Sequence, residues 1–182
     1  MQDVVRPALE VSVTVAGADR MRELGGRLAG LLRAGDLIVL SGPLGAGKTT
    51  LTQGIGAGLG VRGPVTSPTF VIARVHPSLR GGPALVHADA YRLGSRAEID
   101  DLDLDTDVDS SVTVVEWGEN LAEGLAPSFL EITIAPPPPP AAAGPAESGR
   151  DGDEPRTLRV TGWGPRWELA AQAARAALSG TP

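Results

Sequence analysis

One stretch of the sequence carries the residues that a phosphate-binding loop needs, in the order in which it needs them. It reads Gly42-Pro43-Leu44-Gly45-Ala46-Gly47-Lys48-Thr49 and matches the pattern G-x-x-x-x-G-K-T in full. Glycines let the backbone bend around a phosphate with its N–H groups pointing inward, and a helix that starts at the lysine adds partial positive charge. Lys48 would neutralise the terminal phosphates of a nucleotide, and Thr49 would bind Mg²⁺. The sequence therefore predicts a P-loop.

Two acidic residues follow short apolar runs, where a P-loop protein needs a carboxylate to hold Mg²⁺ or its water. Asp89 ends the run 84–88, and Glu116 ends the run 112–115. Each could instead cap a turn or face solvent. Because both runs end in an acid and accompany a P-loop, we favour a functional role for both residues. The residues alone leave open which carboxylate contacts the metal and which orients water.

The lysine content bears on which nucleotide is bound. Lys48 is the only lysine, and the other fifteen of the sixteen basic residues are arginine. GTPases that select guanine use an Asn-Lys-x-Asp segment, which cannot occur here because the chain has one asparagine, Asn120, and no second lysine. ATP is therefore the expected nucleotide. A single lysine fits a place that needs a compact ammonium and would not accept a planar guanidinium.

The bulk composition describes one ordinary domain. The chain has 182 residues, 42% of them hydrophobic, which is enough for a single core. It has no cysteine, which excludes disulfides, thiolate metal sites and a cysteine nucleophile. We expect a cytoplasmic protein, because no apolar run approaches the roughly 18–20 residues of a membrane span and the N-terminus has no signal-peptide pattern. The net charge of −6 argues against direct binding of tRNA or DNA.

The elements that must position these residues alternate between strand and helix patterns. Strands are expected at 11–15, 37–40, 70–75, 84–88, 112–115, 129–134 and 157–161; helices at about 21–32, 48–59 and 167–178; and a short acidic helix or turn at 96–104. Asp19 is the candidate cap of the first helix. This order predicts an α/β protein, with a three-layer P-loop NTPase fold in which helices flank a mainly parallel central sheet.

Two stretches depart from this pattern. Glycines at 54, 56 and 58 weaken the second helix by up to about 1 kcal/mol each, and we expect close packing against the sheet to explain their presence. Residues 136–155 begin with five prolines and continue with small and charged residues. That composition predicts a disordered or polyproline-like loop, inserted between two strands of a single domain that spans residues 1–182.

Four motifs together resemble one family. The P-loop is accompanied by the segment 66–70 (Thr-Ser-Pro-Thr-Phe), the segment 87–93 (His-Ala-Asp-Ala-Tyr-Arg-Leu) and the pair Glu116-Trp117. Their order and approximate spacing resemble TsaE, also called YjeE, the ATPase subunit of the bacterial machinery that makes threonylcarbamoyladenosine in tRNA. The acidic stretch 98–104 adds to the likeness, which covers about residues 9–134 and, more weakly, 156–178.

The resemblance implies a role for each matching residue. The nucleotide would be bound by Gly42, Leu44, Gly45, Ala46, Gly47, Lys48, Thr49, Thr50, Trp117 and Arg156. Mg²⁺ would be bound by Thr49 and Glu116, with Asp89 in the Walker B place, near the γ-phosphate or its water. The catalytic residues would be Lys48, Asp89, Glu116 and Thr69, the last within a switch-like loop that senses the γ-phosphate.

Some of these roles have a structural alternative. Thr69 could instead stabilise a turn after Pro68, and Tyr91 and Trp117 could be packing residues. The chain also departs from the family pattern: Ala88 and Ala90 stand where family members have an aromatic residue and a leucine. The longer, proline-rich loop at 136–155 leaves the family match of Arg156 dependent on how that loop is aligned.

The same resemblance implies an activity and partners. The protein would bind ATP with Mg²⁺, hydrolyse it slowly alone, act on the TsaB–TsaD heterodimer, and meet tRNA only through that complex. Two other functions fit the residues. A small-molecule kinase would use the same P-loop with Arg74, Arg80 and Arg92 over the phosphates, and a nucleotide-gated binding module would bind ATP without useful turnover. A P-loop scaffold alone does not choose among the three.

Overall fold

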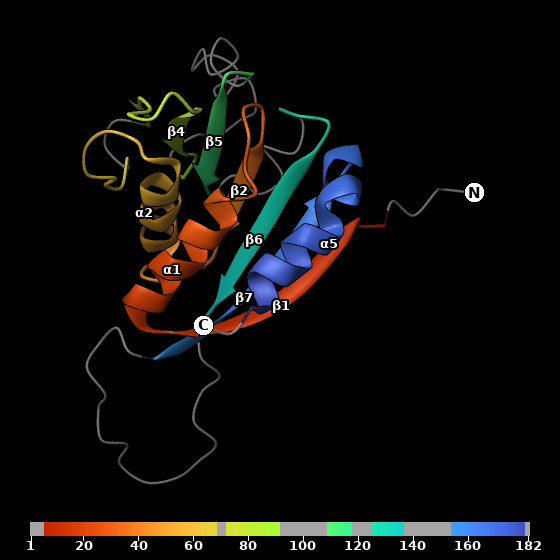
Figure 1. Cartoon of the computed structure of the whole chain (residues 1–182). Helices are drawn as coiled ribbons and strands as arrows, with labels where there is room; N and C mark the ends of the chain where they lie inside the picture. Colours follow the sequence, from red (N-terminus) through yellow and green to blue (C-terminus); the bar gives the residue numbers. More distant parts are fainter. Residues whose placement is uncertain (1–5, 69–71, 92–108, 118–124, 137–153, 181–182) are drawn as a thin grey trace, which may run out of the picture.

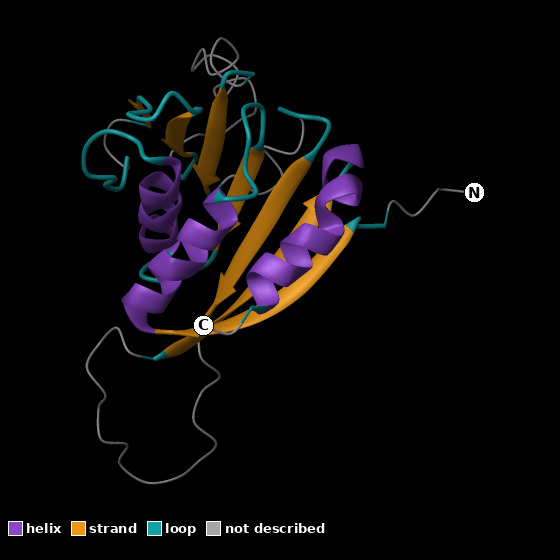
Figure 2. Ribbon diagram, viewed as in Figure 1, coloured by secondary structure: helices purple, strands orange, loops and turns teal. Residues whose placement is uncertain are grey.

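The structure is a computed structural model that describes residues 6–68, 72–91, 109–117, 125–136 and 154–180. These residues form a seven-stranded sheet whose three helices all lie on one face (Figures 1 and 2). The strands are β1 (Leu9–Ala16), β2 (Leu37–Ser41), β3 (Ala73–His76), β4 (Ala84–Asp89), β5 (Ser111–Glu116), β6 (Phe129–Ala135) and β7 (Pro155–Trp163). The helices are α1 (Gly17–Ala29), α2 (Lys48–Leu59) and α5 (Pro165–Ser179).

The sheet is parallel at its centre and antiparallel at its margins. Its strand order is β1-β7-β6-β2-β5-β4-β3. Neighbouring strands are parallel from β6 through β2 and β5 to β4, whereas β7, β1 and β3 join by antiparallel pairing. The predicted α/β fold, with helices flanking a sheet that is parallel at its centre, is confirmed. The described helices form one layer, so the third layer of the predicted three-layer arrangement is not seen among the described residues. The carboxyl ends of β2, β5 and β4 meet at one edge, where a ligand site is expected in such sheets.

Both faces of the central strands are buried. Ile38 and Leu40 of β2 belong to the large core that α1, α2 and α5 cover. Leu37 and Val39 belong to a second cluster on the opposite face, which no described helix joins. Because successive strand residues point to opposite faces, burial on both sides explains why this strand is apolar without alternation.

The glycines of α2 allow close contacts, although their neighbours differ from those we expected. A Cβ on Gly54 would lie 2.2 Å from the Arg22 carbonyl oxygen of α1, and one on Gly58 would lie 2.5 Å from the Ala29 Cβ, also of α1. Only Gly56 faces the sheet side, where a Cβ would lie 3.3 Å from Leu85 of β4. The expected packing against the sheet is therefore wrong for Gly54 and Gly58, which permit close helix–helix contact instead.

Several element bounds differ from the sequence expectation. α1 begins at Gly17 with Ala16 as its N-cap, so Asp19 lies inside the first turn and the predicted cap is wrong. β3 begins at Ala73, and the preceding residues 69–71 lie outside the described residues. The same holds for the predicted helix or turn at 96–104 and for most of the proline-rich segment, 137–153. No helix in the described part of the chain is long and apolar enough to cross a membrane.

A buried ion pair fixes the C-terminal helix to the connection between α1 and β2. The Arg166 Nε donates to Asp36 Oδ1 at 3.0 Å and its Nη2 donates to Asp36 Oδ2 at 3.0 Å. The same Nη2 also donates to the Leu31 carbonyl at 2.7 Å. The Asp36 side chain is 4% exposed and that of Arg166 is 14% exposed. Removal of one partner would leave the other charge buried without its main compensation.

The glycine contacts predict opposite effects for two adjacent residues of α1. Gly25→Ala should lower the free energy of unfolding by about 1–3 kcal/mol, because its Cβ would lie 2.4 Å from the Leu51 carbonyl oxygen. Gly26→Ala is the matched control: its Cβ would meet only the Gly54 carbonyl oxygen, at 3.9 Å. That variant should be neutral or gain up to about 1 kcal/mol of helix propensity. Urea denaturation of both variants measures the difference, and equal stabilities would contradict the packing described.

Breaking the buried ion pair should destabilise the protein more than breaking an exposed one. Arg166→Ala should lower the free energy of unfolding by about 3 kcal/mol, because it leaves the Asp36 carboxylate buried with fewer partners. The control is Arg159→Ala, which breaks an exposed pair with Glu10 whose side chains are 65% and 50% accessible. Such pairs contribute at most about 1 kcal/mol. Thermal unfolding followed by circular dichroism compares the two, and a loss of equal size would show that the Arg166 pair is no more important than a surface pair.

Candidate nucleotide-binding site

The P-loop connects the buried strand β2 to the start of α2. Three of its glycines have positive φ angles, 143° at Gly42, 76° at Gly45 and 106° at Gly47, a region that side-chain-bearing residues rarely adopt. Gly42 is also confined in space, since a Cβ there would lie 2.6 Å from the Ile134 carbonyl oxygen of β6. The first turn of α2 follows Gly47 directly, so N–H groups that helical bonds leave unused face the loop.

Lys48 is the buried cation of this site. It is 5% exposed, and its ammonium donates to the carbonyl oxygens of Gly42 at 2.8 Å and Pro43 at 3.1 Å. The Trp117 ring lies over the same ammonium, with 3.9 Å between Nζ and the ring centroid. These contacts hold the charge inside the loop at the start of α2, where phosphates would bind.

Glu116 is the buried carboxylate nearest to the loop. It ends β5, the strand beside β2, and is 3% exposed. Its Oε1 accepts a hydrogen bond from the Thr49 hydroxyl at 3.0 Å and lies 2.8 Å from His87 Nε2 of β4. The sequence predicted Thr49 and Glu116 as members of one site, and the structure brings them into direct contact.

Asp89 stands one strand further from the loop. It pairs in register with Glu116 across β4 and β5 and is 5% exposed. Its Oδ1 accepts a hydrogen bond from the backbone N–H of Tyr91 at 2.9 Å, so the carboxylate caps the turn after β4. It also lines the cavity beside the P-loop. Asp89 therefore both caps the turn after β4 and lies in the candidate site.

Trp117 has an unusual backbone that places its ring in the site. Its φ angle is 60°, a left-handed conformation that is uncommon outside glycine. Its backbone N–H donates to the Leu40 carbonyl at 2.9 Å, and its ring lies 5.3 Å, centroid to centroid, from Tyr91. Backbone outliers of this kind concentrate at functional sites. Trp117 thus packs on Tyr91 and contacts the site lysine as well.

A cavity of about 270 Å³ lies over the P-loop. It is lined by Leu44, Gly45, Ala46, Gly47, Lys48, Thr49, Thr50, Ser67, Asp89, Glu116 and Trp117. Three residues predicted for the site are not among them. Gly42 contributes its carbonyl to Lys48 instead, Arg156 lies half-buried on β7 opposite Val15, and Thr69 lies outside the described residues. The cavity volume suits a phosphate chain better than a whole nucleotide.

The oxygen atoms at this cavity suit Mg²⁺, but the described residues supply only part of a complete set of ligands. Mg²⁺ prefers oxygen ligands, and it commonly takes one or two from the protein with the rest from phosphates and water. The Thr49 hydroxyl and the Glu116 carboxylate supply such oxygens. No group of three or more His, Cys, Asp or Glu side chains that could hold a metal occurs among the described residues. The site therefore matches a cation that arrives with a nucleotide.

The arginines that a kinase would use lie away from this cavity where the structure describes them. Arg74 is exposed on β3, and Arg80 is exposed in the segment that follows it. Neither lines the cavity, and Lys48 is the only cation among the described residues that line it. Arg92 lies outside the described residues.

Two residues of the site were not singled out from the sequence. Ser67 lines the cavity and belongs to the segment 66–70, in which only Thr69 was predicted as a site residue. His87 contacts Glu116 although it was quoted only as part of a motif. The available signal for His87 was a polar residue in the otherwise apolar run 84–88, two positions before Asp89 and so on the same strand face.

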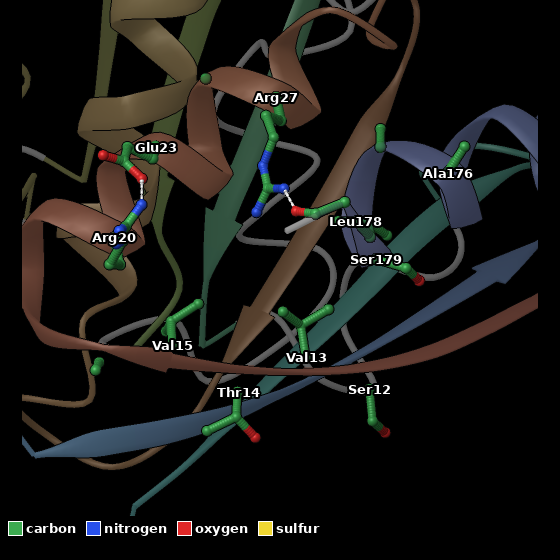
Figure 3. A pocket seen from close by; sticks show the side chains of 14 residues that line it. Ser12, Val13, Thr14, Val15, Arg20, Glu23, Arg27, Ala176, Leu178 and Ser179 are labelled. Carbon is green, nitrogen blue, oxygen red and sulfur yellow. Dashed lines mark hydrogen bonds and ion pairs between the residues drawn. The ribbon is translucent and has the colours of Figure 1, made fainter. Parts of the chain in front are cut away.

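A larger cavity of about 1090 Å³ lies elsewhere, between β1, α1 and the end of α5 (Figure 3). Arg27 spans it and donates to the Gly180 carbonyl, and Arg20 pairs with Glu23 at its rim. None of the residues predicted for the site lines it. Size alone therefore does not identify the functional site of this protein.

The P-loop at the carboxyl edge of a parallel sheet defines a P-loop nucleotide-binding protein. The family described as "Threonylcarbamoyl adenosine biosynthesis protein TsaE" matches residues 15–138. This chain belongs to the TsaE family, which is involved in the biosynthesis of threonylcarbamoyladenosine in tRNA.

Individual relatives agree with that assignment. The chain is 60% identical over 151 residues to the tRNA threonylcarbamoyladenosine biosynthesis protein TsaE of Streptomyces coelicolor, covering 82% of this chain and 95% of that protein. It is 35% identical over 145 residues to the protein of the same name from Bacillus subtilis, covering 79% and 80%. The crystal structure of Bacillus subtilis YdiB superposes with a TM-score of 0.66 at 27% identity, over 95% of this chain and 97% of that one.

Proposed function

We propose that this protein is an ATP-binding, Mg²⁺-dependent ATPase subunit that acts on a TsaB–TsaD heterodimer during the formation of threonylcarbamoyladenosine in tRNA. The observation that carries the ATPase proposal is the juxtaposition of Lys48, Thr49 and Glu116 at one cavity. The loop lysine is buried at the start of α2, and the neighbouring hydroxyl is bonded to a buried carboxylate. Membership of the TsaE family supports the pathway and the presence of protein partners.

Each residue of the site has a defined task in this proposal. Loop amides and the Lys48 ammonium bind the phosphates and compensate their charge. Thr49 and Glu116 would hold Mg²⁺, which would neutralise phosphate charge when bound. Asp89 lies in the same cavity, where it would orient the attacking water. Trp117, already against Lys48, would cover the phosphate end of the nucleotide.

The charges around the cavity argue for a slow reaction in the isolated protein. An arginine over the transferred phosphoryl group contributes about 10³–10⁵-fold to the rate in related phosphoryl-transfer enzymes. Among the described residues that line the cavity, Lys48 is the only cation. We therefore infer that acceleration depends on the partner complex. The net charge of −6 also fits a subunit that meets tRNA only through its partners.

The direct test measures ATP hydrolysis by the purified protein, alone and with purified TsaB–TsaD heterodimer. A slow basal rate that rises when the heterodimer is added would support the proposal, with the heterodimer alone as the blank. Phosphoryl transfer to a small acceptor would instead establish a kinase. Tight ATP binding without turnover, even beside the partners, would establish a nucleotide-gated binding module. A hydrolysis rate that does not change when the heterodimer is added, together with no association between the two, would overturn the assignment.

Substitution of the loop lysine separates its charge from its shape. Lys48→Ala should weaken ATP binding about 10–100-fold, the equivalent of one charge-assisted hydrogen bond. Lys48→Arg should also lose affinity, because a planar guanidinium does not fit a loop that encloses a compact ammonium. Isothermal titration calorimetry with ATP and Mg²⁺ measures these affinities.

The control for the loss of one positive charge is Arg62→Ala. Arg62 is exposed just beyond the opposite end of α2, so its removal should leave the ATP affinity unchanged. Thermal melts show whether each variant is folded. A folded Lys48→Ala variant with unchanged ATP affinity would refute the role given to the lysine.

A further inference from the structure

A histidine lies directly behind the site carboxylate. His87 is fully buried in β4, and its Nε2 lies 2.8 Å from Glu116 Oε1. Asp89 pairs in register with Glu116, so His87 is the diagonal neighbour of Glu116 on the same sheet face. Neither the P-loop motif nor the cavity lining includes His87. A buried imidazole in contact with a site carboxylate therefore has no place in the function described so far.

The direction of the hydrogen bond follows from its two groups. A carboxylate can only accept hydrogen bonds, so His87 must donate its Nε2–H to Glu116. The other ring nitrogen, Nδ1, is buried and has no hydrogen-bond partner among the described residues. The donation to Glu116 is thus the one polar contact that the imidazole makes in the described part of the chain. Burial of Nδ1 without a partner costs free energy. The hydrogen bond to Glu116 is the polar contact that offsets this cost.

The two donors to Glu116 approach the same oxygen atom. Thr49 Oγ1 and His87 Nε2 both bond to Oε1, from α2 and from β4 respectively. These two donors restrict the orientation of the carboxylate, and no described residue donates a hydrogen bond to Oε2. The Thr49 hydroxyl is itself expected to bind the cation. His87 is the donor to Glu116 that has no other role in the proposed function.

We propose that His87 is a positioning residue that orients the Glu116 carboxylate for the metal that accompanies the nucleotide. The proposal rests on the proposed function in one respect, namely that Glu116 serves a bound Mg²⁺. Groups that hydrogen-bond to a ligating carboxylate hold it in its binding orientation, and their loss typically weakens metal affinity about 10–100-fold. His87 is expected to act through Glu116, without contact to ATP.

The measurable consequence is a change in the linkage between Mg²⁺ and the nucleotide. In the wild-type protein, Mg²⁺ should tighten nucleotide binding, and the ratio of the dissociation constants in EDTA and in Mg²⁺ gives that coupling. His87→Leu should reduce the ratio about tenfold or more, with the affinity in EDTA unchanged. His87→Gln should largely restore the ratio, because a glutamine amide can place a donor near the position of Nε2. Fluorescence titration with an N-methylanthraniloyl derivative of ADP measures both constants without any turnover.

Three further single variants and one double variant distinguish a positioning role of His87 from a role in core packing alone. His87→Asn keeps a polar side chain that is too short to reach Glu116, and it should behave like His87→Leu. His76→Leu is the matched control, because His76, at the end of the edge strand β3, is also buried but contacts the Arg62 carbonyl instead of Glu116. It should leave the ratio unchanged. Glu116→Gln should lower the ratio, and the double variant with His87→Leu should be no lower than Glu116→Gln alone, since His87 acts through Glu116.

The outcomes distinguish this inference from the function on which it rests. A normal ratio in folded His87→Leu and His87→Asn, with a low ratio in Glu116→Gln, would overturn the role of His87 alone. Additive losses in the double variant would also overturn it, because they would show that His87 acts independently of Glu116. If Mg²⁺ does not tighten nucleotide binding in the wild type, both the metal role of Glu116 and the positioning role of His87 are refuted.

Discussion

The organisation of this protein depends on two opposite charges that are buried at the same edge of the sheet. Lys48 is 5% exposed and Glu116 is 3% exposed. Burial of a charge is costly unless hydrogen bonds or other charges compensate it. The compensation here is separate for each group: two loop carbonyls and a tryptophan ring surround the ammonium, whereas a hydroxyl and an imidazole bond to the carboxylate. Both charges line the same cavity over the P-loop.

The fold provides this arrangement through close backbone contacts that only glycine permits. The P-loop turns sharply because Gly42, Gly45 and Gly47 adopt positive φ angles. The helix that follows lies against α1 because Gly54 and Gly58 have no side chain at the contact. Each of these glycines lowers helix or chain stability locally. Packing of α1 and α2 over one core offsets that loss and fixes the start of α2, which carries Lys48 and Thr49.

The sequence predicted features that depend on neighbouring residues, and it did not predict contacts between residues far apart in the chain. Apolar runs such as 37–40 and the G-x-x-x-x-G-K-T spacing report on neighbouring residues, so β2, α2 and the P-loop were predicted with nearly correct bounds. The His87–Glu116 contact joins residues 29 positions apart, and the Arg166–Asp36 pair joins residues 130 apart. The first contact depends on strand order and register and the second on how α5 packs against the sheet, neither of which periodicity encodes. The cap assigned to Asp19 failed because Gly17, with its positive φ, starts the helix earlier.

The backbone around Glu116 shows why its side chain alone does not define the site. The Trp117 N–H bonds to the Leu40 carbonyl of β2, and the Glu116 carbonyl accepts from the Ala90 N–H beyond β4. These two bonds attach the end of β5 to both neighbouring strands, just where regular pairing stops. The left-handed conformation of Trp117 costs of the order of 1–3 kcal/mol, and it brings the indole over Lys48. The chain thus turns immediately after the carboxylate, so that consecutive residues, Glu116 and Trp117, contact Thr49 and Lys48 of the P-loop.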